Sequence, residues 1–133
     1  MFIDTSAFVA IFCGESDADI LATCIERAER RCTSPMVRLE TCMVLATRLD
    51  RDPVEVQADF DAFLTEAGIT VLPIDDGIGR GAVEAFRRYG KGRGHPAQLN
   101  LADCLSYACA RAARAPILFK GRDFTHTDLT SAL

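Results

Sequence analysis

The sequence predicts a single α/β domain over residues 1–133, in which a short, mostly parallel sheet lies between two layers of helices, a three-layer α/β/α arrangement. Short apolar segments alternate with longer stretches whose apolar residues recur at helical spacing, a pattern typical of strands joined by helices. The strand candidates lie at residues 1–3, 32–34, 69–74 and 116–119, of which 32–34 is a short strand or turn. A chain of 133 residues is long enough for one sizeable core but not for two.

The first predicted strand ends abruptly at an acid. Met1–Ile3 is apolar, Asp4 follows, and the hydroxyl residues Thr5 and Ser6 lead into the apolar stretch Ala7–Phe12, which predicts a helix. Open α/β sheets bind ligands at the carboxyl ends of their strands, so Asp4 is a candidate site residue. The alternative is that Asp4 or Thr5 only caps the helix with its side-chain oxygen.

Three further helices are predicted over the next part of the chain. Glu15–Arg31 is amphipathic, with its acids early and its bases late, the order that the helix dipole favours. Residues 32–34 predict a short strand or turn, and Ser34-Pro35 predicts the start of the next helix. Asp52 followed by proline predicts a helix that ends near Ala67.

Glu40 is an unusual acid within the second of these helices. Its neighbours one turn away are all apolar, namely Met36, Met43 and Val44. We therefore expect its carboxylate on the buried stripe of the helix, where it is costly unless something pairs with it or coordinates it. Glu40 is a candidate site residue, and the alternative is a buried ion pair with an arginine.

Two adjacent acids close the next predicted strand. Residues 69–74 predict that strand, Asp75 and Asp76 follow it, and a helix is predicted over residues 78–89. Both acids stand at the carboxyl end of a strand, as Asp4 does. They also directly precede a helix, and capping of that helix is the preferred interpretation for both.

A basic, glycine-rich loop at residues 90–96 carries Lys91, Arg93 and His95. Residues 80–122 hold nine basic and two acidic residues, whereas the remainder of the chain holds six basic and seventeen acidic residues. This asymmetry is compatible with a polyanion approaching one side of an acidic protein. The alternatives are that the loop is only a connector and that the bases are solvated helix residues.

Two more acids occur in the last part of the chain. Asn100 and Asp103 open a helix, in a pattern that a purely structural helix start would also show. A short buried strand is predicted over residues 116–119, and Asp123 lies just beyond it. The tail at residues 127–130 is expected to add an edge strand.

The composition excludes several classes of protein. No apolar run approaches the ~20 residues that span a bilayer, and the N-terminus lacks the pattern of a signal peptide, so a cytoplasmic location is expected. Six cysteines are expected to be free thiols, because none forms a Cys-x-x-Cys pair and the context of a small secreted chain is absent.

Asp4, Glu40, Asp103 and Asp123 are expected to meet in one crevice, because a parallel sheet can bring them together. Four carboxylates cannot remain ionised together unless cations neutralise them. Oxygen ligands without histidine or thiolate select hard cations, here Mg²⁺ or Mn²⁺. No serine–histidine or cysteine–histidine arrangement and no phosphate-binding glycine loop is present. Metal-assisted hydrolysis of a phosphodiester is the reaction that remains.

Three ordered blocks of the sequence resemble PIN-domain ribonucleases, and their spacing is especially similar to the VapC toxins of bacterial type II toxin–antitoxin systems. The blocks are Met1-Phe2-Ile3-Asp4-Thr5-Ser6-Ala7, the stretch from Tyr89-Gly90-Lys91-Gly92 to Leu99-Asn100-Leu101-Ala102-Asp103-Cys104, and Leu118-Phe119-Lys120-Gly121-Arg122-Asp123-Phe124. The combination is specific although each block alone is weak. The resemblance extends over nearly the whole chain.

The resemblance implies a PIN-like fold and Mg²⁺- or Mn²⁺-dependent endonucleolytic cleavage of RNA. It implies a homodimer and inhibition by a cognate VapB-type antitoxin that covers the active-site groove. It also implies site roles for particular residues. The metal and catalytic set is Asp4, Glu40, Asp103 and Asp123, and the supporting polar residues are Thr5, Ser6 and Asn100. The basic character of residues 80–122, and not the resemblance, makes Lys91, Arg93, Lys120 and Arg122 the residues expected to bind the RNA.

Two functions other than a nuclease are compatible with clustered acids. A non-enzymatic phosphoacceptor (receiver) domain also binds Mg²⁺ at strand ends, but it requires a pair of acids after the first strand, and only Asp4 is present there. A PIN scaffold that acts only as a binding module is the other, and retention of all four acids argues against it. A phosphomonoesterase with an Asp nucleophile would need a second acid two residues after Asp4, where Ser6 stands.

Overall fold

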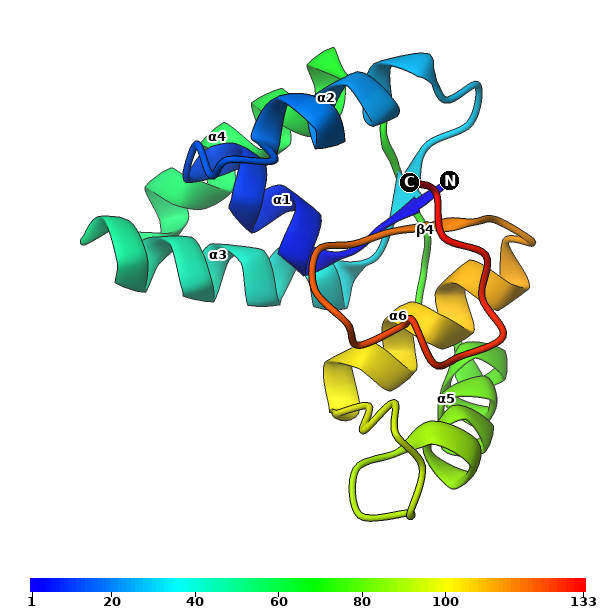
Figure 1. Cartoon of the computed structure of the whole chain (residues 1–133). Helices are drawn as coiled ribbons and strands as arrows, with labels where there is room; N and C mark the ends of the chain where they lie inside the picture. The colour runs from blue at the N-terminus through cyan, green and yellow to red at the C-terminus, as the bar shows by residue number, and fades with distance from the viewer.

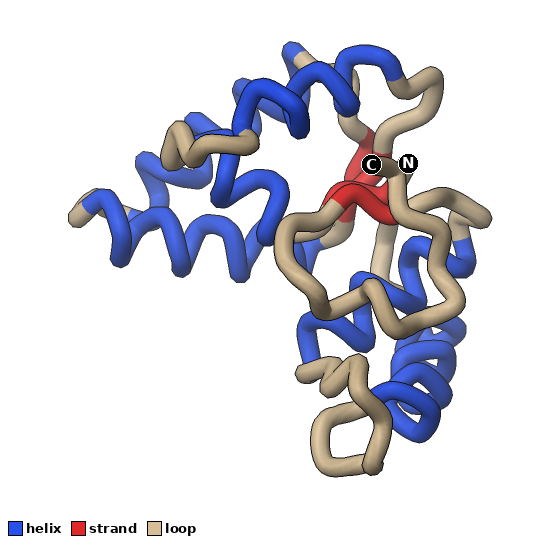
Figure 2. Tube along the Cα trace, in the orientation of Figure 1, coloured by secondary structure: helices blue, strands red, loops and turns tan.

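Four short parallel strands form the centre of the computed structural model, which describes residues 1–133 (Figures 1 and 2). They are β1 Phe2–Ile3, β2 Cys32–Thr33, β3 Thr70–Val71 and β4 Ile117–Leu118. Their order in the sheet is β3-β2-β1-β4, which places β1 in the interior, and all three pairings are parallel. The prediction of a short parallel sheet is confirmed.

Six helices cover the two faces of this sheet (Figure 1). On one side lie α1 Thr5–Phe12, α2 Ala18–Arg27, α3 Pro35–Leu49 and α4 Pro53–Glu66. On the other side α5 Asp76–Tyr89 packs against α6 Leu101–Ala112. The three-layer arrangement predicted from the alternation of elements is therefore confirmed.

Polar side chains cap the starts of five of the six helices, and three of these caps lie outside the candidate site. Ser34, Asp52 and Asp75 each accept a backbone N–H from the first turn of the helix that follows. The capping interpretation of Asp75 is confirmed. Asp76 does not cap: it is the first residue of α5 and pairs with Arg80, one turn further on, at 2.8 Å.

A cluster of aromatic rings holds α1 against α4. Phe8 and Phe60 are completely buried, and their ring centroids lie 4.9 Å apart in an edge-to-face arrangement. Phe63 completes the contact at 6.0 Å from Phe8. Because α1 begins one residue after Asp4, this packing also fixes the direction in which the chain leaves β1.

Three predicted boundaries were wrong. The helix predicted over Glu15–Arg31 covers only Ala18–Arg27, because Ala28 adopts an extended conformation with ψ 131°. The strand predicted over 69–74 is reduced to two residues: Leu72 donates the last ladder hydrogen bond, and the next residue is a proline without an N–H. The edge strand predicted at 127–130 does not form. The tail instead pairs with β4 one residue later, in a single parallel bridge between Ile117 and Ser131.

The segment after β4 runs back across α6 and is anchored by one acid (Figure 1). Asp128 accepts a hydrogen bond from the Tyr107 hydroxyl at 2.6 Å and pairs with Arg88 at 3.3 Å and Arg111 at 3.8 Å. These contacts tie the segment to both α5 and α6. The loop with Asp123, which begins the same segment, therefore has a fixed support.

No helix of the structure is both long enough and apolar enough to cross a bilayer. All six cysteines are free.

Candidate active site

Asp4 lies at the carboxyl end of β1 and is 5% exposed. Its backbone is extended, and its Oδ2 accepts hydrogen bonds from the Ser6 amide at 3.1 Å and the Ser6 hydroxyl at 2.8 Å. Asp4 thus caps α1, which is the alternative role that the sequence suggested for it. Because the carboxylate serves as a cap and also stands at the strand end, the two interpretations of Asp4 are compatible.

A residue that the sequence did not single out bonds to the other oxygen of Asp4. The hydroxyl of Ser106, on α6, donates to Asp4 Oδ1 at 2.9 Å in a buried contact. Ser106 stands three residues after Asp103, so the two side chains share a face of the helix. That spacing is the only sign of its position in the sequence, and it becomes informative only once α6 is known to pack against β1.

Asp103 opens α6 and forms a reciprocal cap with Asn100. The backbone N–H of Asn100 donates to Asp103 Oδ2 at 2.8 Å, and the backbone N–H of Asp103 donates to the side-chain oxygen Oδ1 of Asn100 at 2.9 Å. Burial raises the pKa of the Asp103 carboxyl to about 6, and the hydrogen bond from Asn100 opposes that rise. The negative charges of Asp4, Asp123 and Glu40 raise this pKa further.

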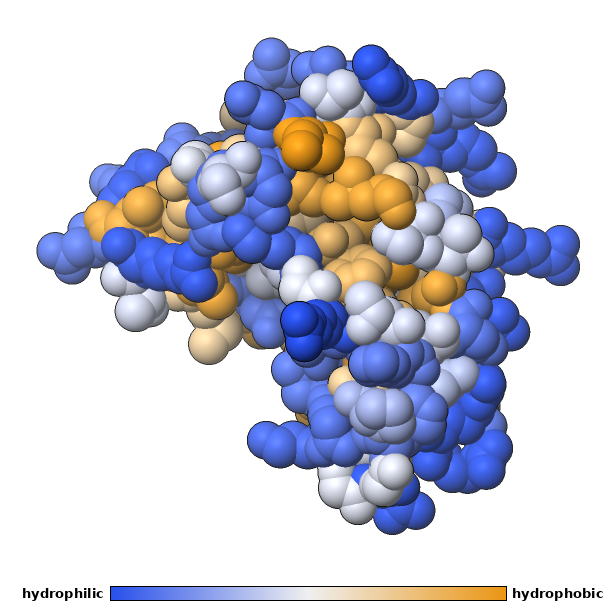
Figure 3. Space-filling model, in the orientation of Figure 1, coloured by the Kyte–Doolittle hydropathy of each residue, from blue (hydrophilic) through white to orange (hydrophobic).

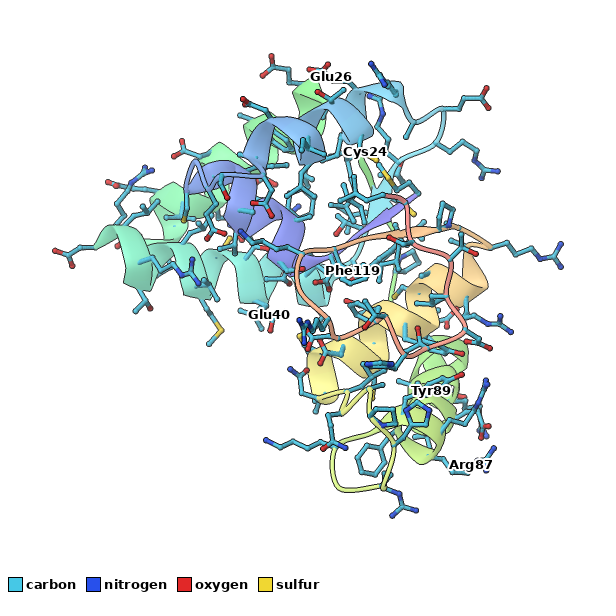
Figure 4. All side chains as sticks on the ribbon, in the orientation of Figure 1. Cys24, Glu26, Glu40, Arg87, Tyr89 and Phe119 are labelled. Carbon is cyan, nitrogen blue, oxygen red and sulfur yellow. The ribbon has the colours of Figure 1, made fainter.

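The charges of Asp4, Glu40 and Asp123 therefore act on the Asp103 carboxyl, so these three acids lie within electrostatic range of the start of α6. Glu40 extends from α3 near the first turn of α6 (Figure 4). Its Oε2 accepts a hydrogen bond from the Thr5 hydroxyl at 2.6 Å. Thr5 therefore links the start of α1 to Glu40 on α3.

The reasoning that led to Glu40 was wrong although the residue lies beside the site. The buried face of α3 consists of Val37, Thr41, Cys42 and Leu45. Met43 is 59% exposed and Glu40 is half-buried, so this carboxylate is not on the apolar stripe. The alternative of a buried ion pair is also absent, because Arg38 pairs with Asp61 and Arg48 with Glu15.

Asp123 occupies an exposed position in the loop after β4. The start of this loop is held at two points. The Lys120 amide donates to the Ser6 hydroxyl at 3.0 Å, and the Lys120 ammonium pairs with Asp17 at 2.8 Å and with Glu15. Ser6 therefore connects Asp4 to the loop that carries Asp123, as a supporting residue.

The basic residues predicted to face RNA differ in whether their charges are already paired with acids of the same chain. Lys120 is engaged with two acids, as described above. Lys91 and Arg93 are exposed in the loop after α5, and the Arg93 guanidinium lies 5.7 Å from the centre of the Phe86 ring. His95 has a structural role, since its Nδ1 accepts the Ala97 amide and its ring packs on Tyr89.

The donor chemistry of the four acids fits a hard divalent cation. The charged groups that act on Asp103 are all carboxylates, and a positive ion bound near them would relieve their repulsion. No three His, Cys, Asp or Glu side chains converge closely enough to form a complete metal site. Mg²⁺ does not require one, because it keeps several waters and is usually bound by one or two carboxylates together with substrate phosphates.

The largest surface cavity lies elsewhere. It measures about 940 Å³ and is bordered by α2, Met1 and residues 130–133. An apolar patch covers this region of the surface, next to the chain termini (Figure 3). Since none of the four acids lines it, the cavity is not part of the candidate site.

Known proteins resemble this chain over nearly its whole length. Residues 1–129 match the family model described as "PIN domain". Ribonuclease VapC42 of Mycobacterium tuberculosis is 43% identical over 132 residues, covering 99% of this chain and 98% of that protein. Ribonuclease VapC28 of the same species is also 43% identical, covering 100% of this chain and 98% of that protein.

Two solved structures share the fold. The crystal structure of Mycobacterium tuberculosis VapC20, titled a sarcin–ricin loop cleaving toxin, superposes with a TM-score of 0.75 at 18% identity, covering 97% of this chain and 95% of that one. A toxin–antitoxin complex from Klebsiella pneumoniae gives a TM-score of 0.69 at 17% identity, covering 96% and 92%.

Proposed function

This chain belongs to the PIN-domain family, and from that premise we propose that it is an endoribonuclease of the VapC type, the toxin of a toxin–antitoxin pair. The whole-length identity to two proteins named as VapC ribonucleases supports this proposal. The receiver-domain alternative is excluded, because the PIN model matches residues 1–129.

The observation that carries the proposal is the placement of Asp4 at the carboxyl end of β1 and of Asp103 at the start of α6, two elements joined by the hydrogen bond from Ser106 to Asp4. The charges of Glu40 and Asp123 also act on Asp103. Carboxylates that repel one another are stabilised by a nearby positive charge, and Mg²⁺ or Mn²⁺ can supply that charge. Asp4 and Asp103 would hold the ion, with Glu40 and Asp123 at its periphery. An ion held by these residues would supply a bound water of lowered pKa and positive charge beside the phosphate and the leaving oxygen.

The residues of the chain itself orient these groups. Ser6 fixes Asp4 and, through the Lys120 amide, the loop of Asp123. Asn100 holds the Asp103 carboxylate, and Thr5 holds that of Glu40. These hydrogen bonds hold the carboxylates of Asp4, Asp103 and Glu40 in one orientation before RNA binds, so that little reorganisation is needed on binding.

Removal of divalent ions is the direct test of metal dependence. We expect the purified protein to cleave single-stranded RNA internally with Mg²⁺ or Mn²⁺, to lose that activity with EDTA, and to regain it when the ion is restored. Denaturing gels of end-labelled RNA would measure this. Cleavage that persists unchanged in EDTA would contradict the proposed role of the four acids.

We also propose that the exposed bases beside the site bind the RNA backbone. Replacing Lys91 and Arg93 together with Ala is expected to weaken RNA binding and to reduce the slope of log K against log[salt] by about 1.4, because each phosphate contact on a single strand contributes about 0.7. Fluorescence anisotropy at several salt concentrations measures the slope. The matched control is Arg27→Ala on α2, and an unchanged slope in the double variant would refute this role.

Two protein partners are part of the proposal. The first is an antitoxin, since a structural neighbour is titled a toxin–antitoxin complex. The second is another copy of the chain. Val83, Phe86 and Leu101 are 70%, 45% and 71% exposed and border an apolar groove between α5 and α6, a surface suited to an interface. Light scattering should give about twice the chain mass of 14.5 kDa, and Val83→Asp should lower it.

A further inference from the structure

The two oxygens of Asp4 are not equivalent. Oδ2 accepts two hydrogen bonds, from the Ser6 amide and the Ser6 hydroxyl. Oδ1 accepts one, from the Ser106 hydroxyl. Because each carboxylate oxygen has two lone pairs, Oδ2 is saturated and Oδ1 retains one acceptor position. A cation held by Asp4 must therefore approach Oδ1, the oxygen that Ser106 also contacts.

Ser106 is well placed to fix that oxygen. It is 1% exposed on α6, and its hydroxyl makes one hydrogen bond, to Asp4. The contact joins residues 102 positions apart, and it connects the helix that begins with Asp103 to the end of β1. A single buried hydroxyl thus links the Asp4 carboxylate directly to the helix that carries Asp103.

We propose that Ser106 is a positioning residue that holds Asp4 Oδ1 toward the divalent cation and keeps its second lone pair available. This inference rests on the proposed metal-dependent function. Without the hydroxyl, the only remaining restraints on the carboxylate act at Oδ2, so Oδ1 is free to turn away. The loss falls on affinity for the ion, because partners that orient metal ligands typically contribute about 10–100-fold to metal binding or activity.

The test measures Mn²⁺ binding by isothermal titration calorimetry, in the absence of RNA, together with thermal unfolding. Ser106→Ala is expected to weaken Mn²⁺ binding about 10–100-fold and to raise the Mn²⁺ concentration for half-maximal cleavage by a similar factor. Ser106→Thr retains the hydroxyl and is expected to restore most of the affinity. If the alanine variant fails to fold, the Mn²⁺ affinities of Ser106→Thr and Ser106→Val are compared with that of the wild type. Thr and Val have the same shape and differ only in the hydroxyl, so weaker binding in the Val variant alone would support the positioning role.

A matched control separates positioning from stability. Val56→Ala removes a buried side chain on α4 and should lower the melting temperature without changing Mn²⁺ affinity. Wild-type affinity in Ser106→Ala, or equal affinity in the Thr and Val variants, would overturn this inference alone. Failure of the wild-type protein to bind Mn²⁺ would instead overturn the metal dependence on which it rests.

Discussion

Replacing Asp103 with Asn is expected to reduce RNA cleavage by about 10³-fold or more while the protein stays folded. The amide oxygen of Asn can still accept the hydrogen bond from the Asn100 backbone, so the start of α6 is preserved and only the negative charge is lost. A metal ion contributes several kcal/mol of charge stabilisation in the transition state, and each 1.36 kcal/mol is a factor of ten in rate. Initial rates on a short labelled RNA measure the loss.

The control for this variant is Asp76→Asn. Asp76 is also an acid in the first turn of a helix, but it is exposed and pairs with Arg80 away from the site. Full activity of Asp76→Asn together with the loss in Asp103→Asn locates the effect in the gathered acids. A fully active Asp103→Asn enzyme would show that the site has been assigned to the wrong residues. Induction of the same variants in cells should give parallel differences in growth arrest.

Replacing Phe8 with Ala is expected to lower the free energy of unfolding by about 3–5 kcal/mol. The ring is completely buried and makes edge-to-face contacts with Phe60 and Phe63, so its removal leaves a cavity between α1 and α4 and ends two aromatic pairs. Urea denaturation measures the change from the midpoint at constant slope.

Val54→Ala is the control for the truncation of Phe8. Val54 is 72% exposed on α4 and lies outside the proposed dimer surface, so its truncation should cost much less stability. Equal losses of stability in the two variants would mean that the Phe8 cluster is not the packing centre of this layer. Because Phe8 follows Asp4 by one helical turn, the Phe8 variant should also weaken the site before it unfolds.

The parts of the fold that depend on local chemistry could be predicted from the sequence. Ser34, Asp52 and Asn100 each start a helix where a short polar side chain precedes an apolar periodic stretch, and each does so in the structure. The ends of α2 and β3 were not predictable in this way. They depend on where Ala28 turns into an extended conformation and where β2 ceases to offer partners to β3.

The candidate site divides in the same way. Asp4 and Asp103 follow from local signals, a strand end and a helix start, and their roles as metal ligands remain predictions. Glu40 was selected for burial among apolar neighbours, and it is instead half-buried beside Thr5. Ser106 could not be selected at all, because a serine in an apolar helix looks like any other small core residue until its partner across the fold is known.

The pairing of β1 with β4 has a consequence for the order of events during synthesis. Asp4 leaves the ribosome early, but the neighbouring strand and the loop of Asp123 come from a part of the chain translated more than a hundred residues later. The nascent polypeptide therefore has no assembled centre until its final segment emerges from the exit tunnel. The candidate site is therefore incomplete throughout translation, because the loop of Asp123 is among the last parts of the chain to be made.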